Sequence, residues 1–395
     1  MGRYLEKFDR VIDRKNTGSL KYDFGPIRKG RGDLLPLWVA DMDFAVPDEV
    51  TQAIMERTEH GIFGYTEPDA SYLEALADWY RVQHGWEICQ EWNTVTPGVV
   101  YAIAVAVRAL TEPGDSVLIQ QPVYYPFSEV IRDNGRKLVN NELILAGGGY
   151  VVDLEDFEKK ITDNHVKLFL LCSPHNPVGR VWTREELLAM GDICRKHGVT
   201  VFSDEIHADF VYRGRKHIPF ASLGEEYADI CITGTSASKT FNLAGLQVSN
   251  ILIANPGLRR TFRKENGAGG YSQANTLGLA ATGAAYRYGH EWHEDLLTYL
   301  EGNLAYIRDY LAEHIPDIRL VEPEGTYLIW LDCTELFDTG KELKAFFEDE
   351  AHIWGDEGAI FGEASAQFER LNIAAPRRVI RQAMKQIDEA LQARR

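Results

Sequence analysis

Short apolar, β-branched runs alternate along this chain with longer stretches of helical periodicity. Four runs are typical of buried strands: Ser116 to Gln120, Leu168 to Cys172, Val199 to Ser203 and Ile230 to Thr233. Between them the pattern predicts helices such as Arg184 to His197, which Thr183 opens with Glu186 three residues on, as in a capping box. This alternation predicts an α/β fold with a mostly parallel central sheet sandwiched by helices.

Polar side chains follow several of the predicted strands. Asn176 comes after the second run, Asp204 and His207 come after the third, and Ser236, Ser238 and Lys239 come after the fourth. Ligands of open parallel sheets bind beyond the carboxyl ends of the strands. We therefore expect these side chains to meet at one edge of the sheet.

A phosphate-binding element is expected further upstream. A short strand at Thr94 to Thr96 is followed by Pro97-Gly98 and by an apolar helix that starts near Val99. The first N–H groups of a helix have no partner within it, so Gly98 and the amides of Val99 and Val100 can hold an anion.

Composition excludes several classes of function. The formal net charge is −17 and no dense block of lysine or arginine is present, which argues against nucleic acid as a partner. The longest apolar stretch, Ala102 to Leu110, contains Arg108 and is too short to span a bilayer, and the N-terminal segment lacks the apolar core of a signal peptide. We expect a soluble, cytoplasmic protein with no membrane contact.

Metal binding is not expected either. The five cysteines lie far apart without a C-x-x-C pair, which is typical of reduced thiols in a cytosolic protein. His290 and His293 have a spacing that suits a metal, but the charges between them favour a solvated helix face. We predict no metal site.

The polar set suits the chemistry of pyridoxal 5′-phosphate. A lysine amine at a strand end can form a Schiff base with the aldehyde of this cofactor. Asp204 can face the pyridine nitrogen and keep it protonated, and Asn176 can donate to the phenolic oxygen. Gly98, Val99, Val100, Ser236 and Ser238 can take the phosphate. Each feature alone has a simpler explanation, such as a turn or a strand-end cap, and the argument rests on their combination.

Four motifs resemble those of the fold-type I pyridoxal-phosphate enzymes related to aspartate aminotransferase. They are TPG at 96–98, NPVG at 176–179, DEIH at 204–207 and SASKTFNLAGL at 236–246. The stretches LWVADMDF, QPVYYPF and SKTFNLAGLQ are similar to the cystathionine β-lyase-like branch, which contains MalY, PatB and the C–S lyase cystalysin. The resemblance extends nearly from end to end, from GPIRKGRGDLL to RLNIAAPR.

The resemblance assigns roles around the cofactor. It implies that Lys239 is the Schiff-base lysine, Asp204 the pyridinium partner and Tyr124 the aromatic residue that stacks on the ring, with Tyr125 a neighbouring active-site tyrosine. It implies that Tyr65 reaches the phosphate of the other subunit, and hence a homodimer with shared active sites. His207 is expected to support Asp204, although a satisfied core histidine is a comparable interpretation.

The resemblance also places the substrate. Arg370, in FERLNIA, is expected to bind the α-carboxylate of an amino acid through a bidentate pair, whereas without the family a surface ion pair is the simpler interpretation. Trp38, Val39 and Ala40 lie where the family closes the carboxylate pocket.

Two further expectations concern reaction and domains. Aspartate aminotransferases commonly have an arginine eight residues after the lysine, where this chain has Gln247, which favours the lyase branch. The expected reaction is α,β-elimination of L-cystathionine or related cysteine S-conjugates. An aminotransferase of aromatic or neutral amino acids and a MalY-like regulator that acts by protein binding remain alternatives.

We expect a large cofactor-binding domain at 50–285 and a small domain made of 1–49 and 286–395.

Overall fold

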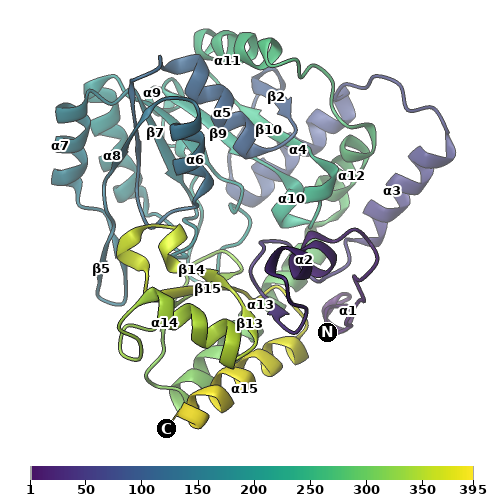
Figure 1. Cartoon of the computed structure of the whole chain (residues 1–395). Coiled ribbons are helices and arrows are strands. Elements are labelled where there is room, and N and C mark those ends of the chain that lie inside the picture. Colours follow the sequence, from purple (N-terminus) through teal and green to yellow (C-terminus); the bar gives the residue numbers. More distant parts are fainter. Residues whose placement is uncertain (1, 395) are drawn as a thin grey trace.

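A mostly parallel sheet with helices on both faces forms the centre of the computed structural model, which describes residues 2–394 (Figure 1). Across the sheet, its strands are β2 (Asn93–Thr96), β10 (Ser249–Leu252), β9 (Cys231–Thr235), β8 (Thr200–Asp204), β7 (Leu168–Cys172), β3 (Ser116–Ile119) and β4 (Lys137–Asn140). The pairs from β9 to β4 are parallel, whereas β10 is antiparallel to both β9 and β2. The predicted fold class is confirmed.

Both faces of the sheet are buried, as the alternation of side chains along β7 shows. Leu168, Leu170 and Cys172 belong to one buried apolar cluster, and Phe169 and Leu171 belong to another. Helices that contribute to the first cluster are α5 (Val99–Leu110), α6 (Pro126–Asp133) and α11 (Pro256–Ala268). Helices that contribute to the second are α4 (Ala70–His84), α7 (Leu154–Asn164), α8 (Arg184–His197) and α12 (Thr276–Tyr288). A strand buried on both faces explains the continuous apolar run.

The predicted elements agree with the structure to within about two residues. Helix α8 has the predicted bounds, and its capping box is formed: the Thr183 hydroxyl accepts from the Glu186 amide at 3.2 Å and the Glu186 carboxylate accepts from the Thr183 amide at 2.8 Å. Strand β8 includes Asp204, so this carboxylate ends the strand rather than following it.

A second, antiparallel sheet is built from the C-terminal part of the chain. Its strands are, in order across the sheet, β11 (Arg319–Val321), β12 (Leu328–Asp332), β15 (Phe368–Asn372) and β14 (Asp356–Glu357). The accompanying helices are α13 (His290–His314), α14 (Gly340–Ala345) and α15 (Arg377–Arg394). The predicted domain boundaries fall within α12 and within α3 (Asp48–Glu59), and the division itself stays a prediction.

The N-terminal segment lies beside the C-terminal part (Figure 1). Strand β1 (Leu35–Pro36) pairs in parallel with β13 (Ile353–Trp354). The remaining elements are α1 (Leu5–Phe8), α2 (Gly25–Lys29), the hairpin of β5 (Ile144–Ala146) and β6 (Gly149–Val151), α9 (Glu225–Ala228) and α10 (Ala237–Thr240). Short 3-10 or π turns lie at 20–24, 90–92, 220–222, 244–246, 346–350, 358–360 and 363–365.

Among residues 2–394, no helix is both long enough and apolar enough to cross a membrane.

The capping box of α8 gives a stability test of the fold. Thr183→Ala removes the hydroxyl that accepts from the Glu186 amide. We expect the free energy of unfolding to fall by about 1 kcal/mol, and Thr183→Ser to retain most of it. Urea unfolding followed by circular dichroism measures the difference. Equal stability of Thr183→Ala and the original protein would show that the Arg180–Glu186 ion pair suffices to hold this helix end.

Candidate functional site

A cavity of about 190 Å³ lies at the carboxyl edge of the central sheet. It is lined by residues that follow β2, β3, β7, β8 and β9, because the carboxyl ends of these strands meet there. The lining residues are Ala40, Pro97, Gly98, Val99, Val100, Tyr124, Cys172, Asn176, Asp204, Ile206, His207, Ser238, Lys239, Ala244, Gln247, Val248 and Ser249. The expected convergence of polar groups is therefore present in the fold.

Lys239 lies on α10, a single turn that follows β9. Its Nζ donates a hydrogen bond to the carbonyl oxygen of Ala40 at 2.7 Å. Burial lowers the pKa of this amine to about 8, the carboxylates of Asp41 and Asp204 oppose that shift, and the Arg370 charge adds to it. A lysine with a lowered pKa exchanges protons and reacts as an amine near neutral pH.

Asp204 ends β8 and is buried. One carboxylate oxygen accepts from the Ile206 amide at 3.1 Å. Burial raises the pKa of Asp204 to about 7, although the nearby Lys239 charge lowers it. A carboxylate in this state gains stability from a cation brought next to it, such as a protonated pyridine nitrogen.

Asn176 is held so that its amide N–H₂ group is available. Its side-chain oxygen accepts from the Arg370 guanidinium at 2.9 Å, which fixes the orientation of the amide. Within residues 2–394, its Nδ2 has no hydrogen-bond partner. The backbone carbonyl of Asn176 accepts from the Tyr124 amide at 3.0 Å, so the loop that carries Tyr124 is tied to the same residue.

His207 is buried, lines the cavity and is not a satisfied core histidine. Its Nδ1 has no hydrogen-bond partner among the described residues. Burial lowers the pKa of His207 to about 3, and the Lys239 and Arg370 charges add to the effect, so the ring is neutral. The hydrogen-bond partner of Asp204 is the Ile206 amide, and the expected support from His207 stays a prediction.

Gly98 and the start of α5 form an anion cradle. Gly98 is the N-cap residue of α5 and has extended backbone angles. A Cβ atom built on it would meet no other atom within 4 Å, because the space in front of this residue belongs to the cavity. Val99 and Val100 present first-turn amides there, and Ser238 adds a hydroxyl.

Ser236 does not line this cradle. Its hydroxyl donates to the Val248 carbonyl at 2.7 Å and accepts from the Ser238 amide at 3.0 Å. The serine thus caps α10 and positions the turn that carries Lys239. The hydroxyl hydrogen that a phosphate contact would need is used within the protein.

Arg370 lies on β15 and is only 2% exposed, so it is not a surface ion pair. Its Nη2 donates to the Trp38 carbonyl at 3.0 Å and pairs with Asp356. Its Nε is buried and has no partner within the described part of the chain. This unused N–H can donate to a further anionic oxygen, as recognition of a substrate carboxylate requires.

The other predicted residues occupy different depths. Tyr124 lines the cavity, and burial raises the pKa of its hydroxyl above the usual range. Tyr125 is next to it, 6.2 Å from the Phe361 ring. Trp38 stacks on the Trp354 ring at 4.4 Å, and the Val39 carbonyl accepts from Asn372 at 2.8 Å. Tyr65 is 94% exposed and does not line the cavity.

The prediction of a solvated face is wrong for His293, whereas His290 is half-buried. His293 is buried and its Nε2 lies 2.7 Å from the Asp209 carbonyl. His290 stacks on Trp79 at 4.6 Å between ring centres. The charged residues around these histidines in the sequence point elsewhere on α13, so local charge gave no guide to burial.

Three contributors were missed by the sequence reasoning. Tyr327 donates to the same Ala40 carbonyl as Lys239, at 2.9 Å. Asn242 and Asn372 bind the backbone of residues 39–44. Asn242 lies three residues after Lys239 and Asn372 two residues after Arg370, which was the one available signal for these two, whereas Tyr327 has no predicted site residue near it in the chain.

The arrangement fits pyridoxal phosphate group by group. The cavity offers an amine for an aldehyde, a buried carboxylate for a ring cation, an amide donor for a phenolic oxygen and a helix N-terminus for a phosphate. Gln247, which replaces the arginine of aspartate aminotransferases, lines the same cavity.

Comparison with known proteins agrees with this geometry. Residues 32–387 match the family model for aminotransferase class I and II. Cystathionine β-lyase PatB of Bacillus subtilis is 42% identical over 97% of this chain and 99% of its own length. Protein MalY of Escherichia coli is 35% identical over 98% of this chain and 99% of its own length.

A solved structure gives the same result in three dimensions. Cystalysin from Treponema denticola, whose crystal structure contains a pyridoxal 5′-phosphate cofactor, superimposes with a TM-score of 0.95 at 38% identity. The match covers 98% of this chain and 99% of cystalysin. The chain therefore belongs to the class I and II aminotransferase family, in the branch of pyridoxal-phosphate-dependent C–S lyases that includes PatB and cystalysin.

Proposed function

We propose that this protein is a pyridoxal 5′-phosphate-dependent C–S β-lyase. Its substrate is an L-amino acid with a thioether at Cβ, such as L-cystathionine or a cysteine S-conjugate, and its products are pyruvate, ammonia and a thiol. The observation that carries the proposal is the convergence of Lys239, Asp204 and Asn176 on one cavity, with Arg370 hydrogen-bonded to Asn176, in a chain of this branch.

The residues divide the work between cofactor and substrate. When bound, pyridoxal phosphate supplies an aldehyde that bonds to amines and a ring that stabilises negative charge at Cα. The N-terminus of α5 and Ser238 would hold its phosphate, Asp204 would keep its ring nitrogen protonated and Asn176 would donate to its phenolic oxygen. Arg370 binds the α-carboxylate of the substrate through its unused donors.

Lys239 acts as the base. Its lowered pKa leaves a useful fraction of neutral amine near neutral pH. The Cα proton moves to Nζ, the Cβ–S bond breaks and the sulfur leaves with the electron pair. The proton then held by Lys239 is available to the leaving thiolate. Water hydrolyses the unsaturated amino-acid product to pyruvate and ammonia.

Assembly into a homodimer with shared active sites is part of the proposal. Tyr65 is exposed together with Ile62 and Phe63 on the loop between α3 and α4. Such an apolar loop is costly to leave in water, and a second copy of the chain would cover it. Tyr65 would then reach the phosphate site of the other subunit.

A cytoplasmic location is supported by the cysteines. All five are free, and Cys172, Cys194, Cys231 and Cys333 are buried. Free thiols in these numbers are typical of a reducing compartment.

Product release tests the reaction. We expect the protein, loaded with pyridoxal phosphate, to release pyruvate and free thiol from L-cystathionine with no 2-oxo acid present. Pyruvate is measured with lactate dehydrogenase and thiol with a chromogenic disulfide. Lys239→Ala should lower the rate by roughly 10²–10⁴-fold, because the base is lost.

Other outcomes would redirect the assignment. Amino-group transfer to an added 2-oxo acid, with no thiol release, would make the protein an aminotransferase. Loss of both activities, with specific binding to another protein, would favour a regulator of the MalY kind.

Asp204→Asn tests the pyridinium partner through stability. The raised pKa of about 7, against an ordinary value of 3.8, means that the folded cofactor-free protein binds more protons than the unfolded chain between these pH values. The carboxylate therefore costs stability as the pH rises toward 7 and above. We expect cofactor-free Asp204→Asn to melt higher than the original protein, by a margin that grows between about pH 4 and pH 7 and is constant above it, while its lyase activity is lost.

Asp163→Asn is the matched control, because Asp163 is an exposed carboxylate on α7. Its melting temperature should differ from that of the original protein by the same small amount at every pH. A pH-independent difference for Asp204→Asn as well would contradict the buried, proton-binding carboxylate.

Tyr65→Phe tests the shared site. We expect a mass of two chains in solution and a pyridoxal phosphate affinity roughly tenfold weaker, because one charge-assisted hydrogen bond to the phosphate is lost. Light scattering and absorbance titration measure the two quantities. Tyr306→Phe, on α13 against Arg377 and Arg381, serves as the control. A dimer with unchanged affinity would remove Tyr65 from the phosphate site.

A further inference from the structure

The strap, which we define as Leu37–Phe44, passes beside the cavity between β1 and α3 without regular secondary structure. Its backbone groups therefore take their partners from other segments. Two of its carbonyls bind the groups that the proposed reaction uses: Ala40 accepts from Lys239 and Trp38 accepts from Arg370. The strap thus touches both the base and the carboxylate-binding group.

Asn372 binds the strap from the Arg370 side. It lies two residues after Arg370 on β15, and side chains two apart point to the same face of a strand. Its amide nitrogen donates to the Val39 carbonyl at 2.8 Å and to the Asp41 carbonyl at 2.6 Å. Its backbone amide donates to the Leu37 carbonyl at 2.8 Å. One residue thus fixes three carbonyls of the strap.

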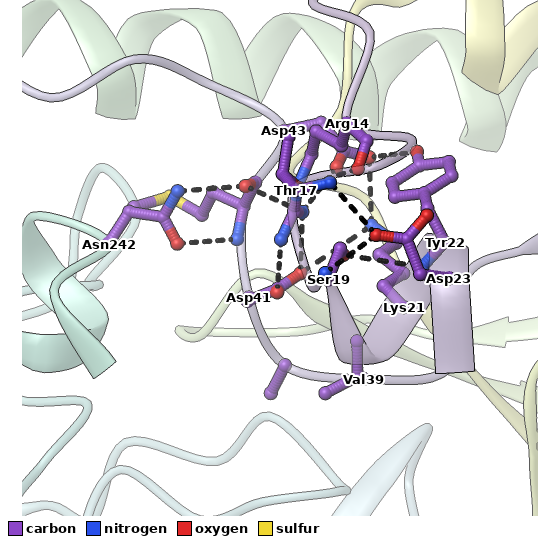
Figure 2. Close-up of polar contacts among 12 residues, drawn as sticks. Arg14, Thr17, Ser19, Lys21, Tyr22, Asp23, Val39, Asp41, Asp43 and Asn242 are labelled. Atoms are coloured by element: carbon purple, nitrogen blue, oxygen red, sulfur yellow. Dashed lines mark hydrogen bonds and ion pairs between the residues drawn. The ribbon is translucent and has the colours of Figure 1, made fainter. Parts of the chain in front are cut away.

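Asn242 binds the strap from the segment that follows Lys239 in the chain, and Figure 2 shows Asn242 beside the strap. It lies three residues after Lys239 and has a left-handed backbone, with φ of 57°, which asparagine tolerates well. Its side-chain oxygen accepts from the Met42 amide at 3.0 Å, and its nitrogen donates to the Met42 carbonyl at 2.8 Å and to the Phe44 carbonyl at 3.2 Å. Because Asn242 binds both the backbone amide and the backbone carbonyl of Met42, it fixes the register of the strap.

The N-terminal segment holds the acidic side chains of the strap (Figure 2). Arg14 binds both oxygens of Asp41, at 3.0 and 2.7 Å, and one oxygen of Asp43 at 2.7 Å. Lys21, which is fully buried, and Tyr22 bind the other oxygen of Asp43 at 2.8 and 2.9 Å. Opposite charges thus neutralise the buried Asp43, and the strap is held on a further side.

We propose that Asn242 and Asn372 are positioning residues that act together through the strap. The inference rests on the proposed function and deepens it. Asn242 ties the segment that carries Lys239 to the strap, and Asn372 ties the strand that carries Arg370 to it. Lys239 and Arg370 themselves each donate a hydrogen bond to a strap carbonyl. The strap therefore sets the position of the Lys239 amine relative to the Arg370 guanidinium, which fixes where Cα of a bound amino acid lies with respect to the base.

The two residues should fail in different ways when changed. Asn372→Ala releases the strap from the Arg370 side, so we expect mainly a higher KM. Asn242→Asp keeps the acceptor for the Met42 amide and tolerates the left-handed backbone, but it places an oxygen where the two carbonyls need a donor. We expect it mainly to lower kcat. Each kcat/KM should fall by about tenfold or more, since small misplacements at a site are costly.

The double variant distinguishes a shared strap from two separate effects. If both residues act through the same segment, the double variant loses little more than the worse single variant. If they act separately, the two losses multiply. The measurements are kcat and KM for thiol release, for the holoenzyme and its three variants.

Asn141→Ala is the matched control. Asn141 is fully buried, as Asn372 is, and donates two hydrogen bonds, to the Asp153 carbonyl and the Asp156 carboxylate, but it lies outside the cavity and the strap. It should lower the melting temperature and leave kcat and KM unchanged. Asn372→Gln, which keeps an amide at a shifted position, replaces Asn372→Ala if that variant yields no soluble protein.

The inference is overturned if the asparagine variants change only the melting temperature, as the control does, or if their losses multiply. Failure of the proposed function is a separate result, namely no thiol release by the original protein. In that case a pH titration of the visible absorption band of the bound cofactor can still be measured. Its midpoint depends on the surroundings, and hence on the position, of Lys239. A shift in Asn372→Ala, which adds no charge, that is absent from Asn141→Ala supports the inference, and equal midpoints overturn it.

Discussion

The desolvated amine of Lys239 is the feature on which the rest of the site depends. An amine in a protein cavity loses its charge easily, and here its pKa is lowered to about 8. The groups around it limit that effect: the Ala40 carbonyl accepts its hydrogen bond, and the carboxylates of Asp41 and Asp204 favour its charged form. The same balance makes the amine a base near neutral pH and explains why polar groups from five strands surround it.

The position of this amine was accessible from the sequence because it follows from periodicity and topology. Apolar runs such as Leu168 to Cys172 identified strands buried on both faces, and parallel strands bring their carboxyl ends to one edge. Asp204, Asn176 and Lys239 were found in this way. Their distances and orientation were not accessible, because the Arg370 contact that orients Asn176 joins residues 194 apart in the chain.

The errors have a common physical origin. The flanking serines predict that Ser236 binds phosphate; in the structure its hydroxyl caps α10 and binds backbone groups, and the phosphate contact stays a prediction. His293 was expected in solvent because charged residues flank it, yet a 3.6-residue period places neighbours on different sides of α13. Asn242 and Asn372 were missed because an asparagine that binds a distant backbone looks the same in sequence as one in a turn. Local composition does not report partners that are far away in the chain.

Arg370 shows how the fold prepares the site for a substrate charge. The guanidinium is buried, and Asp356 and the carbonyl of Trp38 bind one side of it while the Asn176 oxygen binds another. Burial of a lone cation would be costly, so Asp356 compensates it within the protein. Burial raises the pKa of Asp356, and the Arg370 charge and its hydrogen bond oppose that rise. The Nε–H of the paired guanidinium stays free for the substrate carboxylate that the proposed function assigns to it, while the hydrogen bond to the Trp38 carbonyl ties the arginine to the strap.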